Sequence, residues 1–402
     1  MSSCLAQKVI KEIVFTGIEK TKPEYLSYFI HSVSGQTLDS VLLERDRQNL
    51  ANLEILSDAQ FQVREQPEGY TVEFHCKELY SFLPILNFGG IKENIWFLAG
   101  FTHVNLSGKG NKLLSYYQYY DRHSFSTNIQ FDFIRGTPFG VNLNFVKWST
   151  LEPLFFDGGT VEYRYDNYTY GAQGTYHFDL DNSLAIGGSY FTEEYNAATG
   201  LVEGAPQELK TRKTLFKFRY NHNGINYFYF YQSGIQLITD YQVVFSLDGD
   251  PTFHVLFNTL TFFKRMGDRG NFASRFKVGL SSNQESPFAP FVLDSYVNIR
   301  GVGNRVDRGT GQLVSNIEYR HAFIDGNTFA VQGLVFSDLG TWRQPGGTLH
   351  DFIEKRNVVW FGGFGARVIH KKIFNAVLRF DYGFNLRNTD GNGFVIGIGQ
   401  YF

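Results

Sequence analysis

Residues 374–384, FNAVLRFDYGF, alternate large apolar side chains with small or polar ones along most of their length. Successive side chains of a β-strand point to opposite faces, so this pattern predicts a strand with one apolar and one polar face. Residues 213–222 and 311–322 repeat the pattern, with Lys217 and Glu318 on their polar faces. Strands that face lipid on one side and a polar interior on the other have this pattern. The stretch therefore favours a transmembrane β-barrel.

The composition agrees with a barrel. The 402 residues include 41 Phe, 24 Tyr and 41 Gly but only 2 Met, and 17% of the chain is aromatic. Aromatic residues suit strands and the girdles of a membrane barrel, whereas a helical soluble protein of this length would contain more Leu, Ala and Met. Apolar runs such as residues 95–101 are far shorter than the ~18 residues that a membrane-spanning helix needs. A helical membrane protein is therefore excluded.

From residue 80 onward the helix period is absent and two-residue alternation recurs in sixteen segments. An even number of strands places both ends of a barrel wall on the same side of the membrane. A soluble β-sandwich shares the alternation, but sixteen strands in one uninterrupted meander are unusual for that fold. The expected strands are residues 80–89, 94–105, 112–121, 124–134, 140–152, 160–178, 183–196, 213–222, 226–240, 253–264, 272–282, 311–322, 328–342, 358–370, 373–387 and 393–402.

Residues 8–78 have a different pattern and predict a small domain before the barrel. Two helices are expected, the first opened by Pro23, which suits a first helical turn, and the second capped by Thr37 or Asp39. The element order is β-α-α-β-β, with a Pro-Glu-Gly turn between the last two strands. The expected strands of this domain are residues 9–16, 59–65 and 70–78.

Charge, cysteine content and motifs exclude several classes of function. The net charge of −2 gives no case for nucleic-acid binding. Cys4 and Cys76 are too few for a disulfide framework or a metal site, and Cys76 is interpreted as a buried small residue. No catalytic serine motif and no metal-spaced His/Cys cluster occurs, so we expect no enzyme, no cofactor and no metal. Residues 1–7 are interpreted as a signal-peptide stub, a lipobox remnant with a lipid on Cys4, or an ordinary tail.

Five short motifs follow one another at the expected strand positions. They are NLSGKGN at residues 105–111, IRGV at residues 299–302, Phe336-x-Asp338-x-Gly340, Gly363-x-Gly365-x-Arg367, and residues 393–402, which end in Phe402. Together they resemble the BamA/TpsB superfamily of outer-membrane insertases and translocators, also described as the bacterial surface antigen family. The resemblance covers nearly the whole chain, although Val302 replaces the aromatic residue of the family's loop motif.

The resemblance implies an all-β membrane protein. Its expected fold is a 16-stranded antiparallel transmembrane β-barrel, residues 79–402, preceded by one small β-α-α-β-β POTRA-like domain, residues 8–78. It implies the outer membrane of a Gram-negative bacterium, with the POTRA-like domain in the periplasm. The implied partners are outer-membrane lipids and client β-barrel or exported proteins, with other assembly-complex subunits as further candidates.

The loop of residues 283–310 is the first candidate site, and we expect it to fold into the barrel lumen. An Arg inside a barrel needs a carboxylate, because an unpaired desolvated charge costs several kcal/mol. Arg300 is therefore predicted to bridge Asp338 and Glu318, which lie on the polar faces of their strands. This contact either only stabilises the fold or also takes part in function. The predicted loop lock is Arg300, Gly301, Glu318, Phe336, Asp338 and Gly340, and the predicted barrel-lumen motif is Gly363, Gly365 and Arg367.

The lateral seam between the first and last expected strands is the second candidate site. Pro84 lacks a backbone N–H donor, which suits an edge strand, and glycines in the last strand pack weakly. A weak seam exposes strand edges that can pair with an incoming strand, and lateral opening is the proposed insertion route in the family. The alternative is that the glycines only relieve crowding at barrel closure. The predicted seam residues are Pro84, Gly393, Gly397, Gly399 and Phe402.

Three functions remain open on these grounds. The chain is expected to be an insertase that assists assembly of outer-membrane proteins, a translocator that exports a partner through the barrel, or a non-catalytic auxiliary or scaffold barrel. A single POTRA-like domain is fewer than the several domains usual in assembly proteins and the two usual in exporters. No plug helix is visible before residue 8, which disfavours the translocator.

Overall fold

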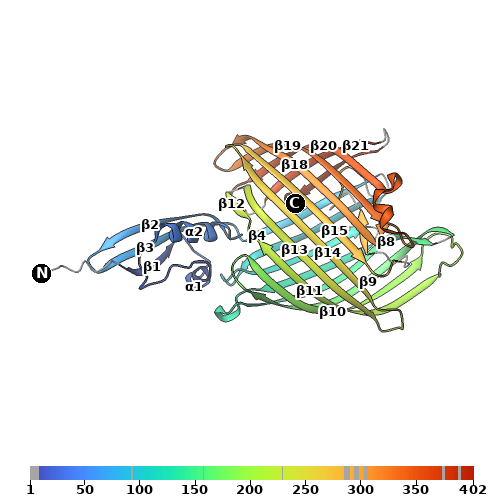
Figure 1. Ribbon diagram of the computed structural model, residues 1–402, viewed down its shortest axis with the longest axis horizontal. Coiled ribbons are helices and arrows are strands. Elements are labelled where there is room, and N and C mark those ends of the chain that lie inside the picture. The colour runs from blue at the N-terminus through green and yellow to red at the C-terminus, as the bar shows by residue number, and fades with distance from the viewer. Residues whose placement is uncertain are drawn as a thin grey trace.

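The computed structural model describes residues 9–402 except 92–93, 121, 157, 229, 285–289, 294–297, 303–306, 374–375 and 388–390. The chain forms a small N-terminal domain at one end of a β-barrel (Figure 1). The predicted fold class, an all-β barrel behind a small β-α-α-β-β unit, is confirmed. Among the described residues, no helix combines the length and the apolar character needed to cross a membrane.

The N-terminal domain contains a three-stranded sheet in the order β1-β3-β2, in which β1 is parallel and β2 antiparallel to β3. Asp39 caps α2, because its carboxylate accepts hydrogen bonds from the main-chain N–H groups of Val41 and Leu42. These are two of the donors that a helix start leaves without a partner. The elements are β1 (Ile10–Thr16), α1 (Pro23–Leu26), η1 (Ser27–Phe29), α2 (Ser40–Ala51), β2 (Leu56–Gln66) and β3 (Gly69–Glu78).

An apolar core holds this domain together. Leu26 and Leu50 of the helices and Phe74 of β3 are fully buried in one cluster. Cys76 of β3 belongs to the same cluster as a free thiol, and burial raises its pKa to about 12. The thiol is therefore an inert packing group, because the thiolate is the reactive form. Cys4 and the segment expected at residues 1–7 lie outside the described residues.

Sixteen strands form a closed barrel in which neighbouring strands follow one another along the chain, and the short β12 folds back onto the start of β13. The sixteen strands are β4 (Phe82–Ile91), β5 (Asn94–Leu106), β6 (Asn111–Tyr120), β7 (His123–Phe131), β8 (Phe139–Phe156), β9 (Gly159–His177), β10 (Asn182–Ala197), β11 (Glu208–Asn223), β13 (Tyr231–Ser246), β14 (Phe253–Met266), β15 (Gly270–Ser281), β18 (Gly311–Asp325), β19 (Phe329–Arg343), β20 (Val358–His370), β21 (Val377–Asn385) and β22 (Asn392–Ile398), and β12 is Asn226–Phe228. The remaining elements are η2 (Ile134–Gly136), β16 (Phe291–Leu293), β17 (Asp307–Gly309), η3 (Leu349–Ile353) and η4 (Lys355–Asn357).

The barrel is apolar outside and charged inside. On β21, Leu378, Phe380 and Tyr382 are exposed on the outer face, whereas Arg379 and Asp381 are buried on the inner face. The largest fully buried side chains of the described residues are three arginines of the barrel domain, Arg300, Arg320 and Arg367. This reverses the arrangement of a water-soluble protein and is the arrangement expected of a barrel whose outer face meets lipid.

Several expected strands begin or end at other residues in the structure, and local contacts explain two of these differences. The segment predicted at residues 226–240 reverses between Phe228 and Tyr231, and β13 then continues to Ser246. The reversal is held by the N-terminal domain, because the Asn52 side chain accepts a hydrogen bond from the N–H of Tyr227 at 3.0 Å. The strand predicted at residues 393–402 ends at Ile398, because Gly399 has a φ of +95° and turns the chain off the wall.

The N-terminal domain docks against barrel turns at the end that carries β12 (Figure 1). Phe133, with a φ of +49°, packs its ring against Tyr28 and Phe29 at centroid distances of 5.8 and 5.3 Å. Glu54 pairs with Lys112 of β6 at 2.9 Å. Left-handed backbone is unfavourable for an aromatic residue and persists only where neighbours hold it. The docking contact therefore stabilises this strained turn.

Candidate functional site

Arg300 lies inside the barrel, in the loop that connects β15 to β18 and contains the hairpin of β16 and β17. Its buried guanidinium donates to both carboxylate oxygens of Asp338, from Nε at 2.8 Å and from Nη2 at 2.9 Å. Its Nη1 donates to Oε2 of Glu318 at 2.5 Å, and its main-chain N–H donates to Asp338 at 3.0 Å. Charge-assisted bonds from a planar fork are strong and geometrically specific, so the loop is fixed to β18 and β19.

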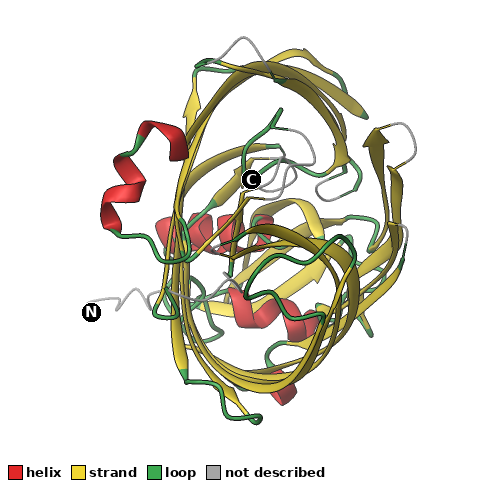
Figure 2. Ribbon diagram, turned by 90° about the vertical axis from the view of Figure 1, so that its right-hand side faces the viewer, coloured by secondary structure: helices red, strands yellow, loops and turns green. Residues whose placement is uncertain are grey.

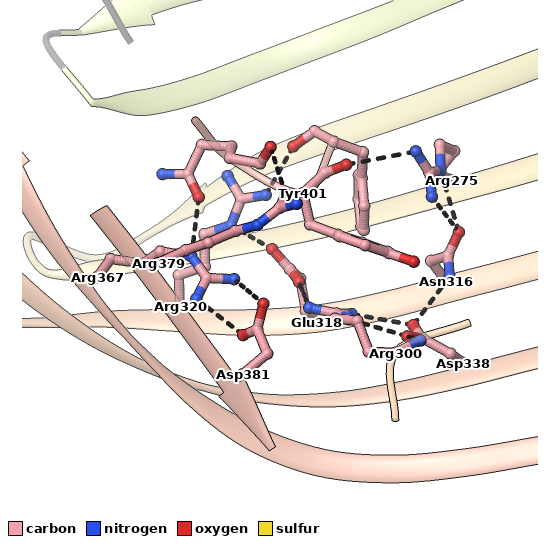
Figure 3. A network of polar contacts seen from close by, with 12 residues as sticks. Arg275, Arg300, Asn316, Glu318, Arg320, Asp338, Arg367, Arg379, Asp381 and Tyr401 are labelled. Atoms are coloured by element: carbon pink, nitrogen blue, oxygen red, sulfur yellow. Dashed lines mark hydrogen bonds and ion pairs between the residues drawn. The ribbon is translucent and has the colours of Figure 1, made fainter. Parts of the chain in front are cut away.

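Further polar side chains extend these bonds into a network (Figure 3). Arg320 donates from Nε to Oε1 of Glu318 at 2.5 Å. Asn316 donates to Oδ1 of Asp338 at 2.9 Å and accepts from Nε of Arg275 at 3.0 Å. Each oxygen of the two buried carboxylates therefore accepts at least one hydrogen bond. Such saturation is what makes a buried ion cluster tolerable, since an unsatisfied charge costs several kcal/mol.

Phe336 and Gly340 share the inner face of β19 with Asp338, as the alternation predicts. The guanidinium of Arg300 lies over the Phe336 ring at 3.7 Å from the centroid. A cation over an aromatic face is stabilised by the ring's quadrupole, most strongly when water is excluded. The structure thus brings the predicted loop-lock residues together around one guanidinium.

Glycines let the loop approach the wall. Gly301 has a φ of +91°, and a Cβ there would lie 2.7 Å from the main chain of Gly383 on β21. Gly383 pairs with Gly393 of β22, where a Cβ would lie 2.9 Å from the oxygen of Gly301. The loop main chain therefore rests directly on the main chain of two strands. This contact gives a packing reason for Gly393, which the sequence assigned to the seam.

The predicted barrel-lumen motif lies on β20 beside the loop lock. Arg367 is fully buried and forms a two-bond fork with Asp381 of β21, at 2.8 and 3.1 Å. A Cβ on Gly363 would lie 2.5 Å from the Phe336 ring, and one on Gly365 would lie 2.2 Å from Asp381. The two glycines thus make room for the ring under Arg300 and for the carboxylate beside Arg367.

The predicted seam residues form two groups: some lie in the barrel wall, and others lie at or beyond the inward turn at Gly399. Pro84 lies in β4, which neighbours β22 in the closed strand order. Gly397 lies on the inner face of β22, where a Cβ would be 3.0 Å from Nε of Arg379. Phe402 is not in the wall. Once Gly399 has turned the chain inward, the Phe402 ring lies near Phe263, and its main-chain oxygen accepts a hydrogen bond from Arg320 at 2.9 Å.

Several members of this network had no predicted role. For Arg379 and Asp381, the alternation along β21 was the available signal. They alternate with the outward-facing Leu378, Phe380 and Tyr382, so the pattern predicts that both point into the lumen. Nothing local marked the inward turn of Tyr401, because the strand pattern continues into the last residues. The unassigned members are Arg275, Asn316, Arg320, Arg379, Asp381 and Tyr401.

The opposite part of the lumen is hollow. A cavity of about 760 Å³ lies against β7–β11 and β13. Small or neutral polar side chains such as Ser126, Asn128 and Asn144 line it, together with Lys217 and Arg219. Across the part of the chain that the structure describes, no group of three or more His, Cys, Asp or Glu side chains is arranged to hold a metal ion.

Neither the protein-family models nor the curated proteins contain a match to this chain. Solved structures do match. BamA from Haemophilus ducreyi lacking POTRA domains 1–3 aligns with 98% of this chain and 84% of its own, at 14% identity and a TM-score of 0.57. CdiB from Escherichia coli aligns with 98% of this chain and 77% of its own, at 11% identity and a TM-score of 0.66. CdiB from Acinetobacter baumannii aligns with 98% of this chain and 74% of its own, at 12% identity and a TM-score of 0.61.

The chain has the fold of the BamA and CdiB barrels. The predicted resemblance to the BamA/TpsB superfamily is thereby confirmed at the level of the fold. The match spans almost the whole chain, so both the N-terminal domain and the barrel take part in it. The shared fold is a β-barrel, which in this chain has a charged lumen and a loop folded into it.

Proposed function

We propose that this protein assists the insertion of other β-barrel proteins into the outer membrane, by parting its wall between β4 and β22. The observation that carries the proposal is the length of the closing strand. β22 has seven residues, whereas β8 and β9 have eighteen and nineteen. A short ladder contains fewer hydrogen bonds, each of which contributes roughly 0.5–1.5 kcal/mol, so the β4–β22 ladder separates more readily than a long ladder such as β8–β9.

The inserted loop supports an opening at this place. Its Gly301 rests on Gly383 and Gly393, so the loop braces β21 and β22 from inside. Arg300 fixes the loop to β18 and β19. When β4 moves away from β22, β22 is still held from the lumen side. The edge of β4 then remains available to pair with an incoming strand by β-augmentation.

A translocator is the second candidate, and the hollow part of the lumen favours it. The cavity of about 760 Å³ has polar walls, which suit the passage of an extended chain. The loop and the last residues fill the other part of the lumen, so transport would need displacement of at least one of them. An auxiliary barrel, in which the filled lumen serves as a rigid scaffold, is the third outcome for the test below.

The proposed location follows from the same arrangement. The exposed apolar side chains of the wall face outer-membrane lipids, and the N-terminal domain lies in the periplasm. Client β-barrel proteins, and other subunits where a complex forms, would meet the N-terminal domain first. Nothing in this mechanism needs a cofactor, a metal or an enzymatic group.

A disulfide across the seam tests the proposal. Leu86 of β4 and Ile396 of β22 both lie on the outer face, and a cysteine is placed at each. Two further variants pair the cysteine at residue 86 with one at Phe394 or at Ile398, so that the neighbouring registers are also tested. Cys4 and Cys76 are replaced first. The purified variant is reconstituted in lipid vesicles, and insertion of an unfolded client barrel is followed as its heat-modifiable band. We expect oxidation to reduce insertion to the protein-free background and reductant to restore it.

The matched control is a disulfide between Leu260 and Phe276, which pair across β14 and β15 on the outer face. This cross-link lies in a longer ladder and should leave insertion unchanged. Full insertion with a closed seam would exclude lateral opening. Absence of insertion by the uncross-linked protein, together with an intact barrel, would favour the translocator or the auxiliary barrel.

A further inference from the structure

The last four residues, Gly399–Phe402, form a tail that occupies the lumen. Figure 1 places this end of the chain in the middle of the barrel, and Figure 2 places it within the ring of strands. The tail is held by an arginine cluster made of Arg275 of β15, Arg300 of the loop, Arg320 of β18 and Arg379 of β21.

Three consecutive main-chain oxygens of the tail each accept a hydrogen bond from a different strand. Gln400 accepts from Arg379 at 3.0 Å, Tyr401 from Arg275 at 3.4 Å, and Phe402 from Arg320 at 2.9 Å. Main-chain oxygens are present in every peptide. This part of the recognition therefore requires an extended backbone and not a particular sequence.

The aromatic rings supply the second part of the recognition. Tyr401 is only 6% exposed, and the guanidinium groups of Arg300, Arg379 and Arg275 lie 4.4, 5.1 and 5.2 Å from its ring centroid. Arg275 also lies over the Phe402 ring at 4.8 Å. Several cations around desolvated rings form an aromatic-binding arrangement, because each ring face carries negative potential.

The charges around the tail explain why the site accepts such a ligand. Glu318 and Asp338 bind Arg300, and Glu318 also binds Arg320. The oxygens and ring faces of the tail are further acceptors for the same group of guanidinium groups. The tail is therefore one part of a connected polar network that the strands and the loop also build.

A route leads to this site from the N-terminal domain. A cavity of about 290 Å³ is lined by Leu56 and Leu79 on one side and by Phe230, Ile369 and Phe402 on the other. A peptide that enters along the N-terminal domain therefore meets the end of the tail. Because the tail begins where β22 ends, its displacement also frees the chain beyond Ile398.

We propose that the arginine cluster is a binding site for an extended peptide with adjacent aromatic residues, and that the tail is its resident, displaceable ligand. This inference deepens the proposed function, because it assigns the client a first contact inside the lumen. While the tail is bound, the site is closed to other peptides. Exchange of the tail for a client segment of the same chemistry couples client arrival to release of the chain next to the seam.

Peptide binding by the purified full chain in detergent tests the inference. The probe is a fluorescent, C-terminally amidated peptide with the sequence of residues 396–402, IGIGQYF. The variant Tyr401→Ala/Phe402→Ala keeps the chain length and empties the aromatic positions, and a second variant lacks residues 400–402. We expect both variants to bind the probe roughly tenfold or more tightly than the unaltered protein, because two ring–cation contacts no longer compete with it.

Arginine geometry is tested in the Tyr401→Ala/Phe402→Ala background. Arg275→Lys removes the planar fork and should weaken probe binding, whereas Arg219→Lys in the hollow part of the lumen should leave it unchanged. Replacement of both aromatic residues of the probe by alanine should abolish binding. Equal probe binding by all variants, or by the alanine probe, overturns the inference. A heat-modifiable band shows that each variant is folded.

This assay is independent of the insertion assay. Probe binding needs no client and no parting of the seam, so it can succeed where the seam disulfide has no effect. Conversely, insertion that depends on the seam while the emptied variants do not bind the probe would retain the proposed function and reject the peptide site.

Discussion

The two halves of the lumen each contain a forked ion pair of an arginine and an aspartate, and they differ in how far water reaches that pair. In the filled half, at β15 and β18–β22, Arg300 and Asp338 form a forked ion pair with both side chains at 0% exposure. In the hollow half, at β11 and β13, Arg219 and Asp240 form the same kind of fork at 2.8 and 2.9 Å. Arg219 is 42% exposed there, and the 5% exposed Asp240 has a second cation, Lys217, at 3.3 Å. The chemistry is the same and the solvation is not.

The difference teaches that an ion pair in this barrel has no fixed energetic value. Where water is excluded, a charge that loses its partner has no substitute, and the loss costs several kcal/mol. Where water reaches the pair, hydration and salt replace the partner at little cost. The filled half therefore behaves as a core made of charges, and the hollow half as an internal surface.

Removing a carboxylate from the filled half should have the largest effect. Asp338→Ala leaves the buried Arg300 with Glu318 as its remaining carboxylate, and Arg300→Ala removes the cation bound to Asp338; each should lower the free energy of unfolding by roughly 3–5 kcal/mol. The measurement is the midpoint of the heat-modifiable gel shift together with denaturant unfolding. The double variant Arg300→Met/Asp338→Ala should lose less than the sum of the single losses, because neither charge remains unpaired. Unchanged midpoints in both single variants would show that the loop lock does not stabilise the barrel.

A methyl group at the loop should have an intermediate effect. Gly301→Ala places a Cβ 2.7 Å from Gly383 in a residue with a φ of +91°, so strain of roughly 1–3 kcal/mol is expected. The matched control is Gly249→Ala in an exposed turn, with a φ of +100° and no neighbour within 4 Å of the added Cβ. Both variants carry backbone strain, so the difference between their midpoints isolates the contact of the loop with β21. Equal midpoints would show that the loop does not rest on the wall in solution.

Cutting the fork in the hollow half should have the smallest effect. Arg219→Gln should cost about 0.2–1 kcal/mol, and the loss should shrink as salt rises from about 0.1 M to 1 M, where charges are screened within a few ångströms. The corresponding loss for Asp338→Ala should be nearly independent of salt. A loss of several kcal/mol for Arg219→Gln would mean that the hollow half is closed to water, and the contrast between the halves would be lost.

Much of the fold could be predicted, because alternation along one strand reports which residues face lipid. Outward Leu378 and Phe380 and inward Arg379 and Asp381 follow from order along the chain alone. The pairing of Arg300 with Glu318 and Asp338 was within reach for the same reason, since an inward charge needs an inward counter-charge. The predicted ends of several strands were wrong, and tertiary contacts explain two of them. At Tyr227, the main-chain N–H donates to Asn52 of the N-terminal domain and not to a neighbouring strand. After Gly399, the chain turns into the lumen, where Arg320 donates to the main-chain oxygen of Phe402.

The sequence by itself therefore determined the barrel, the small domain before it and the inward-facing charges, since these depend on local period and on the cost of exposing charge to lipid. The tertiary structure alone decided which charges meet, which half of the lumen fills, and where the chain leaves the wall. Arg275, Arg320 and Arg379 come from three strands and converge on the tail only after the barrel closes. No local sequence pattern predicts that these three side chains come together, because the distance between their strands depends on how the barrel closes.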